Sequence, residues 1–150
     1  MKKLLVFLLI LASNFALTSC KTPEKEPEEI EVQTFNVETY FAIKHAHKVV
    51  NNQFTIDVEV TPKDSVTGII ETVKFKLSFT YTYSYTQNGK VSEFSNLYEH
   101  VEIKIESLER IIASQTFNLE IPEGATFDNL TISQRTINPF LTAGKIKGYK

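Results

Sequence analysis

Hydrophobic and polar residues alternate along most of this chain after residue 30. The clearest stretch runs from Val73 to Thr86, where every second residue is large and apolar or aromatic and the positions between them hold Lys, Ser or Thr. A period of two is typical of a β-strand with one buried face. We therefore predict a long strand here, with an inward face formed by Val73, Phe75, Leu77, Phe79, Tyr81, Tyr83 and Tyr85.

Shorter alternating stretches predict the other strands. They cover residues 54–61, 101–106, 117–121 and 130–133, and a first strand is expected over residues 31–43, with a slip in its alternation between Val32 and Phe35. Aromatic and β-branched residues, which are enriched in strands, dominate these stretches. No segment has a clear helical period, although residues 107–113 are compatible with one short turn of helix.

Turn-forming residues separate these stretches. Asn88-Gly89 is a strong signal for a two-residue hairpin, and residues 62–64 and 122–124 mark two further turns. The hairpin predicts the cross-strand pairs Gln87 with Lys90, Tyr83 with Phe94 and Phe79 with Tyr98. Continued unchanged, this register would bury His100 and expose Val101, so we expect a β-bulge near residues 98–100 or a new strand starting there.

These elements predict an all-β fold of six or seven strands in a single domain. The expected architecture is an antiparallel β-sandwich that resembles the immunoglobulin-like type. The chain lacks the Cys…Trp…Cys pattern of antibody domains, so the resemblance is to the architecture alone. A small β-barrel is the alternative, because alternation on one face fits both architectures.

The N-terminal residues have a different pattern. Lys2 and Lys3 precede an apolar run from residue 4 to residue 12, which is too short to span a bilayer. Leu17-Thr18-Ser19-Cys20 then resembles the lipobox of bacterial lipoprotein signal peptides. The resemblance covers only the first twenty residues. It implies that residues 1–19 are a signal peptide, that Cys20 carries fatty acyl chains such as palmitate, and that these chains anchor the protein in the outer membrane of a bacterial cell envelope, on its periplasmic or its surface side.

Residues 20–30 contain two prolines and several Glu and Lys residues but almost no apolar surface. Such a segment cannot offset its ordering entropy, so we predict a disordered acidic tether, followed by one β-domain over residues 31–150. The tether is either a plain spacer or an address, because acid-rich stretches after the lipidated cysteine direct some bacterial lipoproteins to the cell surface.

The net charge of the chain limits the classes of partner that we expect. The chain has a net charge of −2, and removal of Lys2 and Lys3 with the signal leaves 14 basic and 18 acidic residues, a net charge of −4. This balance argues against nucleic acid, which favours a basic stripe. Motifs for nucleotide binding, zinc hydrolysis or a serine nucleophile do not occur in the sequence, and we predict no cofactor and no enzymatic activity.

Three groups of residues are candidate sites. His45 and His47 have a spacing that metal sites use, with His100 as a third ligand, but we expect exposed histidines in a loop and no metal. Asp64-Ser65-Val66 resembles a short motif at which some bacteria O-glycosylate exported proteins, which makes Ser65 a possible acceptor. The third group is an aromatic stripe that either belongs to the core or forms an exposed binding platform, and it consists of Tyr81, Tyr83, Tyr85, Phe94 and Tyr98.

The sequence therefore predicts a lipid-anchored envelope lipoprotein whose domain is a non-catalytic binding or accessory module. The membrane contact is made by the lipid anchor, and the partner is a protein or a glycan, reached through the aromatic stripe or by strand addition at a sheet edge. Two alternatives are a carrier that holds a small ligand inside a barrel and an immunity or inhibitor lipoprotein.

Overall fold

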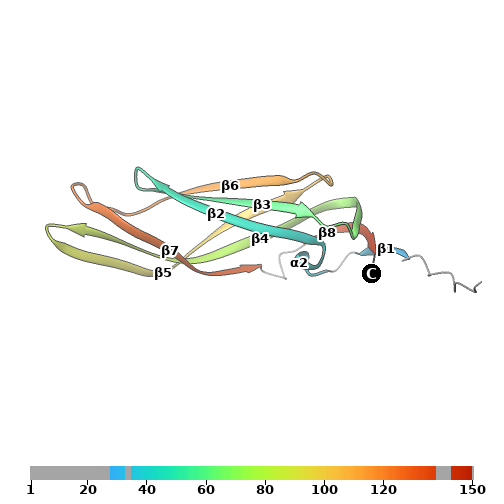
Figure 1. The fold of residues 1–150 in the computed structure, drawn as a ribbon, viewed down its shortest axis with the longest axis horizontal. Coiled ribbons are helices and arrows are strands. Elements are labelled where there is room, and N and C mark those ends of the chain that lie inside the picture. Colours follow the sequence, from blue (N-terminus) through green and yellow to red (C-terminus); the bar gives the residue numbers. More distant parts are fainter. Residues whose placement is uncertain (1–27, 33–34, 138–142, 150) are drawn as a thin grey trace, which may run out of the picture.

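A computed structural model describes residues 28–32, 35–137 and 143–149. These residues form two antiparallel sheets packed face to face (Figure 1). The elements are β1 (Glu29–Val32), α2 (Val37–Tyr40), β2 (Phe41–Val50), β3 (Gln53–Pro62), β4 (Val66–Gln87), β5 (Lys90–Ile105), β6 (Ile111–Asn118), β7 (Thr126–Ile137) and β8 (Ala143–Tyr149). The predicted all-β antiparallel sandwich is confirmed, and its strands form two separate sheets rather than a closed barrel.

Strand β4 organises the larger sheet. β5 pairs with one of its edges, whereas β7 and β8 share the other edge, β8 along the first half of β4 and β7 along the second half. β1 pairs with the outer edge of β8. The smaller sheet has the order β2-β3-β6.

The connectivity is close to that of an immunoglobulin-like sandwich. If the strands from β2 onward are lettered A to G, the smaller sheet is A-B-E and the larger sheet contains the C-F pair, as in that fold. There are two departures. β5 lies beside β4 instead of extending the smaller sheet. β8 pairs with β4, whereas its counterpart in the immunoglobulin-like fold pairs with the counterpart of β7.

The core lies between the two sheets. Alternate residues of β3, from Phe54 to Val60, face alternate residues of β4, and the Phe54 and Tyr81 rings lie 5.0 Å apart. Apolar residues of β5 from Val101 to Ile105 complete the layer. Burial of an aliphatic or aromatic side chain stabilises a fold by about 1.5–3 kcal/mol relative to leaving it exposed, so this layer supplies the main driving force for folding.

The β4–β5 register confirms the hairpin but moves the bulge. Gln87 pairs with Lys90 and Tyr83 with Phe94, as expected. The register then shifts between Tyr81 and Tyr83, opposite residues 95–96 of β5, which is earlier than predicted. Asn96 has a φ of 56°, a left-handed conformation that asparagine tolerates better than most residues. The expected pairing of Phe79 with Tyr98 is therefore wrong.

Four other expectations differ from the structure. The predicted strand over residues 31–43 is divided into β1, the single helical turn α2 and the start of β2. An Asn36 side chain caps α2 by accepting a hydrogen bond from the Glu38 amide at 2.9 Å. No helix occurs over residues 107–113, and β6 begins at Ile111 rather than at residue 117. The C-terminal strand β8 was not predicted.

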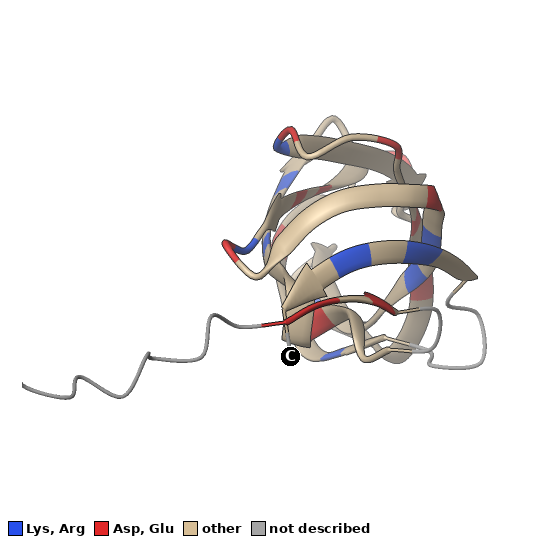
Figure 2. Ribbon diagram, turned by 90° about the vertical axis from the view of Figure 1, so that its right-hand side faces the viewer, with Lys and Arg blue, Asp and Glu red and all other residues tan. Residues whose placement is uncertain are grey.

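β1 is held by charge as well as by backbone pairing. Glu31 forms an ion pair with Lys145, and Glu29 lies 3.5 Å from Lys147, so two carboxylates of β1 face two ammonium groups of β8. The acidic residues of β1 give the red stretch next to the grey trace in Figure 2. The sheet therefore begins at Glu29, two residues before the boundary expected between tether and domain. Each of these exposed pairs adds little stability by itself.

Candidate functional site

The aromatic stripe is divided between the core and the surface. Tyr81, Tyr83 and Tyr85 are buried, and Tyr83 stacks on Phe94 with the ring centroids 5.1 Å apart. Phe94 stays partly exposed at the rim of the same inner face. The three tyrosines of β4 therefore provide core area, and the exposed surface expected from the stripe is reduced to Phe94 and Tyr98.

Tyr98 lies on the opposite face of the sheet from the other four aromatic residues. The bulge at Asn96 reverses the alternation of β5, so that Tyr98 pairs with Thr80, an outward-facing residue of β4. The tyrosine is 62% exposed, yet its hydroxyl donates a hydrogen bond of 2.6 Å to the Ser78 side chain. Ser78 is only 3% exposed, although it also points outward. The Tyr98 ring therefore covers Ser78.

The outer face around Tyr98 consists of hydroxyl and amide side chains. The outward residues of β4 between Ser78 and Thr86 are all Ser or Thr. Gln134 of β7 pairs with Thr80, and the neighbouring register positions of β7 hold Thr131 and Thr136. These side chains donate and accept hydrogen bonds without carrying charge.

Charged side chains lie on this face on both sides of Tyr98, and one group is near the middle of β4. Lys76 forms an ion pair of 2.8 Å with Glu102, and its ammonium group lies 3.4 Å from Nε2 of His100. The hydrogen bond from Lys76 holds the pKa of Glu102 below its usual value. The two opposite charges of the pair largely neutralise each other, whereas Glu93, opposite Ser84, and Asp128, which accepts a hydrogen bond of 2.8 Å from Thr86, add negative charge nearer the β4–β5 turn.

The three histidines do not come together. His45 and His47 lie in strand β2 rather than in a loop, and the His45 ring packs 5.2 Å from the Phe79 ring. His100 lies on the outer face of the other sheet, beside Lys76. Among the described residues, no group of three His, Cys, Asp or Glu side chains could hold a metal ion.

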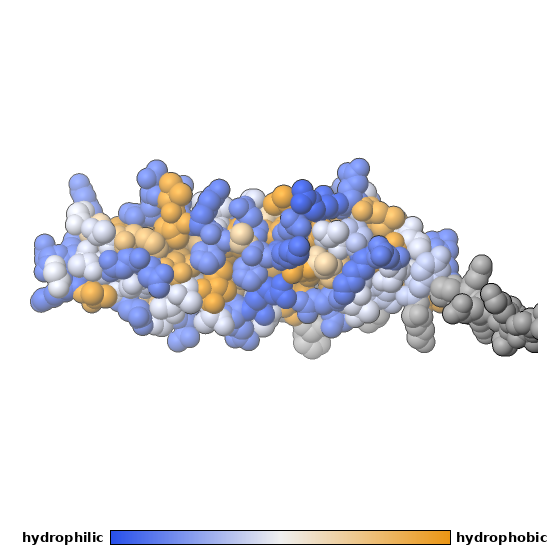
Figure 3. All heavy atoms as spheres, in the orientation of Figure 1, coloured by the Kyte–Doolittle hydropathy of each residue, from blue (hydrophilic) through white to orange (hydrophobic). Residues whose placement is uncertain are grey.

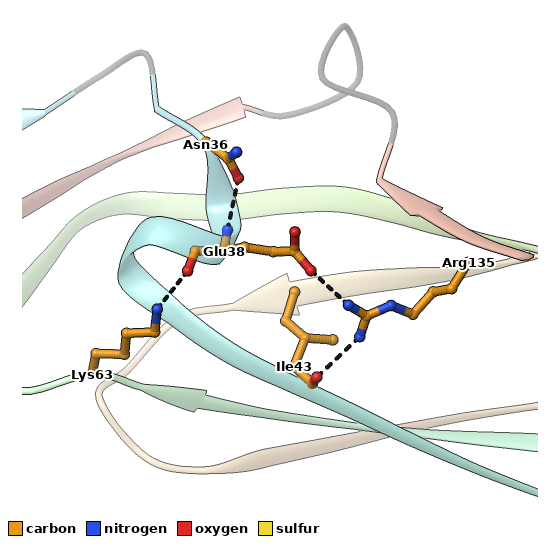
Figure 4. Close-up of polar contacts among 5 residues, drawn as sticks. All are labelled: Asn36, Glu38, Ile43, Lys63 and Arg135. Atoms are coloured by element: carbon orange, nitrogen blue, oxygen red, sulfur yellow. Dashed lines mark hydrogen bonds and ion pairs between the residues drawn. The ribbon is translucent and has the colours of Figure 1, made fainter.

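Arg135 closes the side of the sandwich near His45. Its guanidinium group donates hydrogen bonds to the Ile43 carbonyl at 3.0 Å and to the Glu38 carboxylate at 2.6 Å, which joins β7 to α2 and β2 (Figure 4). Lys63 donates to the Glu38 carbonyl at 2.6 Å from the other side. Partial burial, followed by the charge of Arg135, lowers the pKa of His45. We interpret this cluster as a structural clamp.

A shallow depression of about 310 Å³ lies over the smaller sheet and is lined by Lys44, His45, Ala46, Asp57, Glu59 and Ile112. Its two carboxylates already have partners. Asp57 accepts a hydrogen bond of 2.6 Å from Ser114, and Glu59 lies 3.3 Å from Arg110. The depression therefore offers fewer unpaired polar groups than its composition suggests.

The strand edges carry polar residues that point inward. β1, β2, β5, β6 and β7 each have one edge without a partner strand within the described part of the chain. On the inward face of these strands lie His45 of β2, Glu99 of β5, Gln115 of β6 and Arg135 of β7. Inward polar residues and bulges are devices that discourage pairing with another strand. The faces are therefore better candidates for binding than the edges.

Of the two remaining predicted sites, only Ser65 lies within the residues that the structure describes. Cys20 lies outside the described residues. Ser65 lies in the expected turn between β3 and β4, and its carbonyl accepts a hydrogen bond of 2.8 Å from the Tyr149 amide. Within the described ranges, no helix is both long enough and apolar enough to span a lipid bilayer.

The comparisons with known proteins give no relative. No family model matches the chain, and neither does any curated protein or solved structure.

Sequence reasoning missed Ser78 and Gln134, which lie on the same outer face as the exposed Tyr98. The signal that would have found them is Asn96, because a bulge placed there puts Tyr98 and Thr80 on the same outward face.

Proposed function

We propose that this protein is a lipid-anchored lipoprotein of the bacterial outer membrane, and that its sandwich is a non-catalytic module that binds a protein or a glycan. The sequence basis is the lipobox that ends at Cys20. Two or three acyl chains give stable membrane attachment, whereas one chain gives only marginal binding.

The observation that carries the proposal is the end-to-end arrangement of the sandwich. β1, which follows the lipobox and tether in the sequence, lies at one end beside the C-terminal strand (Figure 1). The turns between β2 and β3, β4 and β5, and β6 and β7 lie at the other end (Figure 1). Hydrogen bonds connect these turns, from the Leu119 amide to the Asn52 carbonyl and from the Gln87 side chain to the Glu123 carbonyl.

This geometry suits a body that is attached at one end and free at the other. The 22 residues of β4 run along the sandwich and span roughly 70 Å at the usual rise of a strand. A domain of this shape presents its sheet faces and its far turns at a distance from the membrane. The visible face in Figure 3 has apolar atoms interspersed with polar ones along its length, as a solvated surface does.

The anchoring half of the proposal is tested by Cys20→Ala. In the native host, this variant should lose labelling by a palmitate analogue and leave the membrane fraction. Ser19→Ala is the matched control, because it keeps a small residue before the cysteine and should leave both properties unchanged. A Cys20→Ala protein that remains fully in the membrane fraction would contradict the anchor.

The binding half is tested by crosslinking the native protein in its own envelope. A binding module should give a discrete crosslinked product with a protein or a glycan, and the product should persist when the protein is expressed at its natural level. A protein that yields only monomer under conditions that crosslink other envelope lipoproteins would argue against a binding role.

A further inference from the structure

The Tyr98 side chain leans over Ser78 on the outer face of the larger sheet. Tyr98 is opposite Thr80, and Ser78 is the next outward residue along β4, so its oxygen is at a diagonal position. A ring standing upright on the sheet would hold its hydroxyl far above the Ser78 oxygen. The 2.6 Å hydrogen bond therefore requires the side chain to lean along the sheet over Ser78, and its 62% exposure leaves much of the ring in contact with solvent.

Several of the side chains that share the outer face with this ring are polar and uncharged. Thr80, Thr82, Gln134 and Thr136 share the outer face with Tyr98. The Ser133 hydroxyl is engaged with the Thr80 carbonyl at 3.1 Å, which helps to fix the adjoining bulge of β7. Charged residues lie further along the face in both directions, the Lys76–Glu102 pair on one side and the carboxylates of Glu93 and Asp128 toward the β4–β5 turn. An exposed aromatic ring thus lies among neutral hydrogen-bonding groups, with acidic residues further along the same face.

We infer that this face, centred on Tyr98, is a binding site for an uncharged saccharide. A sugar ring has one face of polarised C–H groups, which stack on the negative face of an aromatic ring, and an edge of hydroxyls, which exchange hydrogen bonds with side chains such as Thr and Gln. Because this face carries the carboxylates of Glu93 and Asp128, which repel anions, it suits a neutral glycan better than a sulfated or sialylated one.

A protein partner fits this face less well. Protein interfaces have an apolar centre formed by several large residues, surrounded by a polar rim. The large exposed apolar residue nearest the β4–β5 turn on this face is Val91, which pairs with Thr86 and is separated from Tyr98 by the bulge. A single aromatic ring in a field of hydroxyls lacks the apolar area that such an interface needs.

The test uses the full-length protein, purified from its host in detergent micelles, and an array of immobilised neutral, sialylated and sulfated polysaccharides. The wild type should bind at least one neutral glycan and bind the charged ones more weakly. Tyr98→Ala should weaken this binding at least tenfold, and Gln134→Ala at least threefold. Tyr98→Phe keeps the stacking ring and should stay within about threefold of wild type. Thermal melts followed by circular dichroism verify that each variant is folded.

Ile112→Ala is the matched control, because Ile112 is 59% exposed on the outer face of the other sheet. It should bind like wild type. The inference is overturned if no glycan of the array binds, if folded Tyr98→Ala binds as well as wild type, or if Ile112→Ala loses as much binding. It is also overturned if the array stays blank while a photocrosslinker at position 134 captures a protein.

This inference rests on the proposed binding function but not on the anchor. If Cys20→Ala leaves the membrane and the array stays blank, only the glycan site is wrong. If Cys20→Ala remains in the membrane and the Tyr98-dependent binding is present, only the anchor is wrong.

Discussion

Replacing Tyr83 with alanine should destabilise the fold far more than replacing Tyr98 with alanine. Tyr83 is 3% exposed, stacks on Phe94, and its hydroxyl donates a 3.3 Å hydrogen bond to the Glu120 carbonyl. Truncation of a buried aromatic residue to alanine costs about 3–5 kcal/mol, because the lost transfer free energy is joined by the cost of the cavity. The lost hydrogen bond to the carbonyl contributes part of that range.

Tyr98→Ala removes much less. Most of this side chain already contacts water, so little transfer free energy is lost. The main change is the loss of the hydrogen bond to Ser78, whose oxygen water can then reach. A typical intramolecular hydrogen bond contributes about 0.5–1.5 kcal/mol, and we expect a cost in that range. The two tyrosine variants should therefore differ by roughly 3 kcal/mol in their free energy of unfolding.

Urea unfolding of the purified protein, followed by far-ultraviolet circular dichroism, measures the difference. With a slope near 2 kcal/mol per molar urea, Tyr83→Ala should lower the midpoint by about 2 M and Tyr98→Ala by about 0.5 M. Equal midpoints for the two variants would refute the assignment of Tyr83 to the core and of Tyr98 to the outer face. The same result would remove the bulge at Asn96 as the feature that separates them.

Two further substitutions test other parts of the structure. Gly144 has a φ of 131°, and an added Cβ would lie 2.6 Å from the Val73 Cα. Gly144→Ala should therefore lower the free energy of unfolding by about 1–3 kcal/mol, as measured by urea unfolding. Gly68→Ala is the control, because a Cβ there meets only ordinary contacts, and it should cost less than about 1 kcal/mol. The pKa of His45 is lowered by partial burial and by Arg135, so the unfolded chain binds a proton more tightly there and stability should fall as the pH drops below about 6.5. His45→Gln should reduce this loss between pH of about 7 and about 5, and parallel stability curves for wild type and variant would contradict the role of His45.

The sequence predicts the central strands of this fold but not its C-terminal strand. Strands β3 and β4 are recognisable because a buried face opposite a solvated one imposes strict alternation. β8 escaped prediction because Gly144 and Gly148 interrupt its alternation. These glycines are needed where the strand passes close to other backbone, since a Cβ at Gly148 would lie 2.5 Å from the Ser65 carbonyl. Tertiary proximity of this kind leaves no local pattern.

The position of Tyr98 depends on where the β4–β5 register shifts by one residue. Alternation correctly brings Tyr83 opposite Phe94, but it cannot decide whether the bulge falls before or after Tyr98. Both positions restore Val101 to the core, and only one leaves Tyr98 on the inner face. The structure places the bulge at Asn96, whose conformation is easily adopted by asparagine, and this position moves Tyr98 from the face expected for the aromatic stripe to the opposite, outer face.

The pairing of β1 with β8 also determines how the domain responds to tension. β1 is antiparallel to β8, with Glu29 opposite Tyr149 and Val32 opposite Ile146. The hydrogen bonds of an antiparallel pair run perpendicular to the strands. A pull on the chain ahead of Glu29, opposed by a load at the far turns, acts along the strand and strains all of these bonds together. This first strand therefore resists by shear, which is mechanically stronger than opening one bond after another.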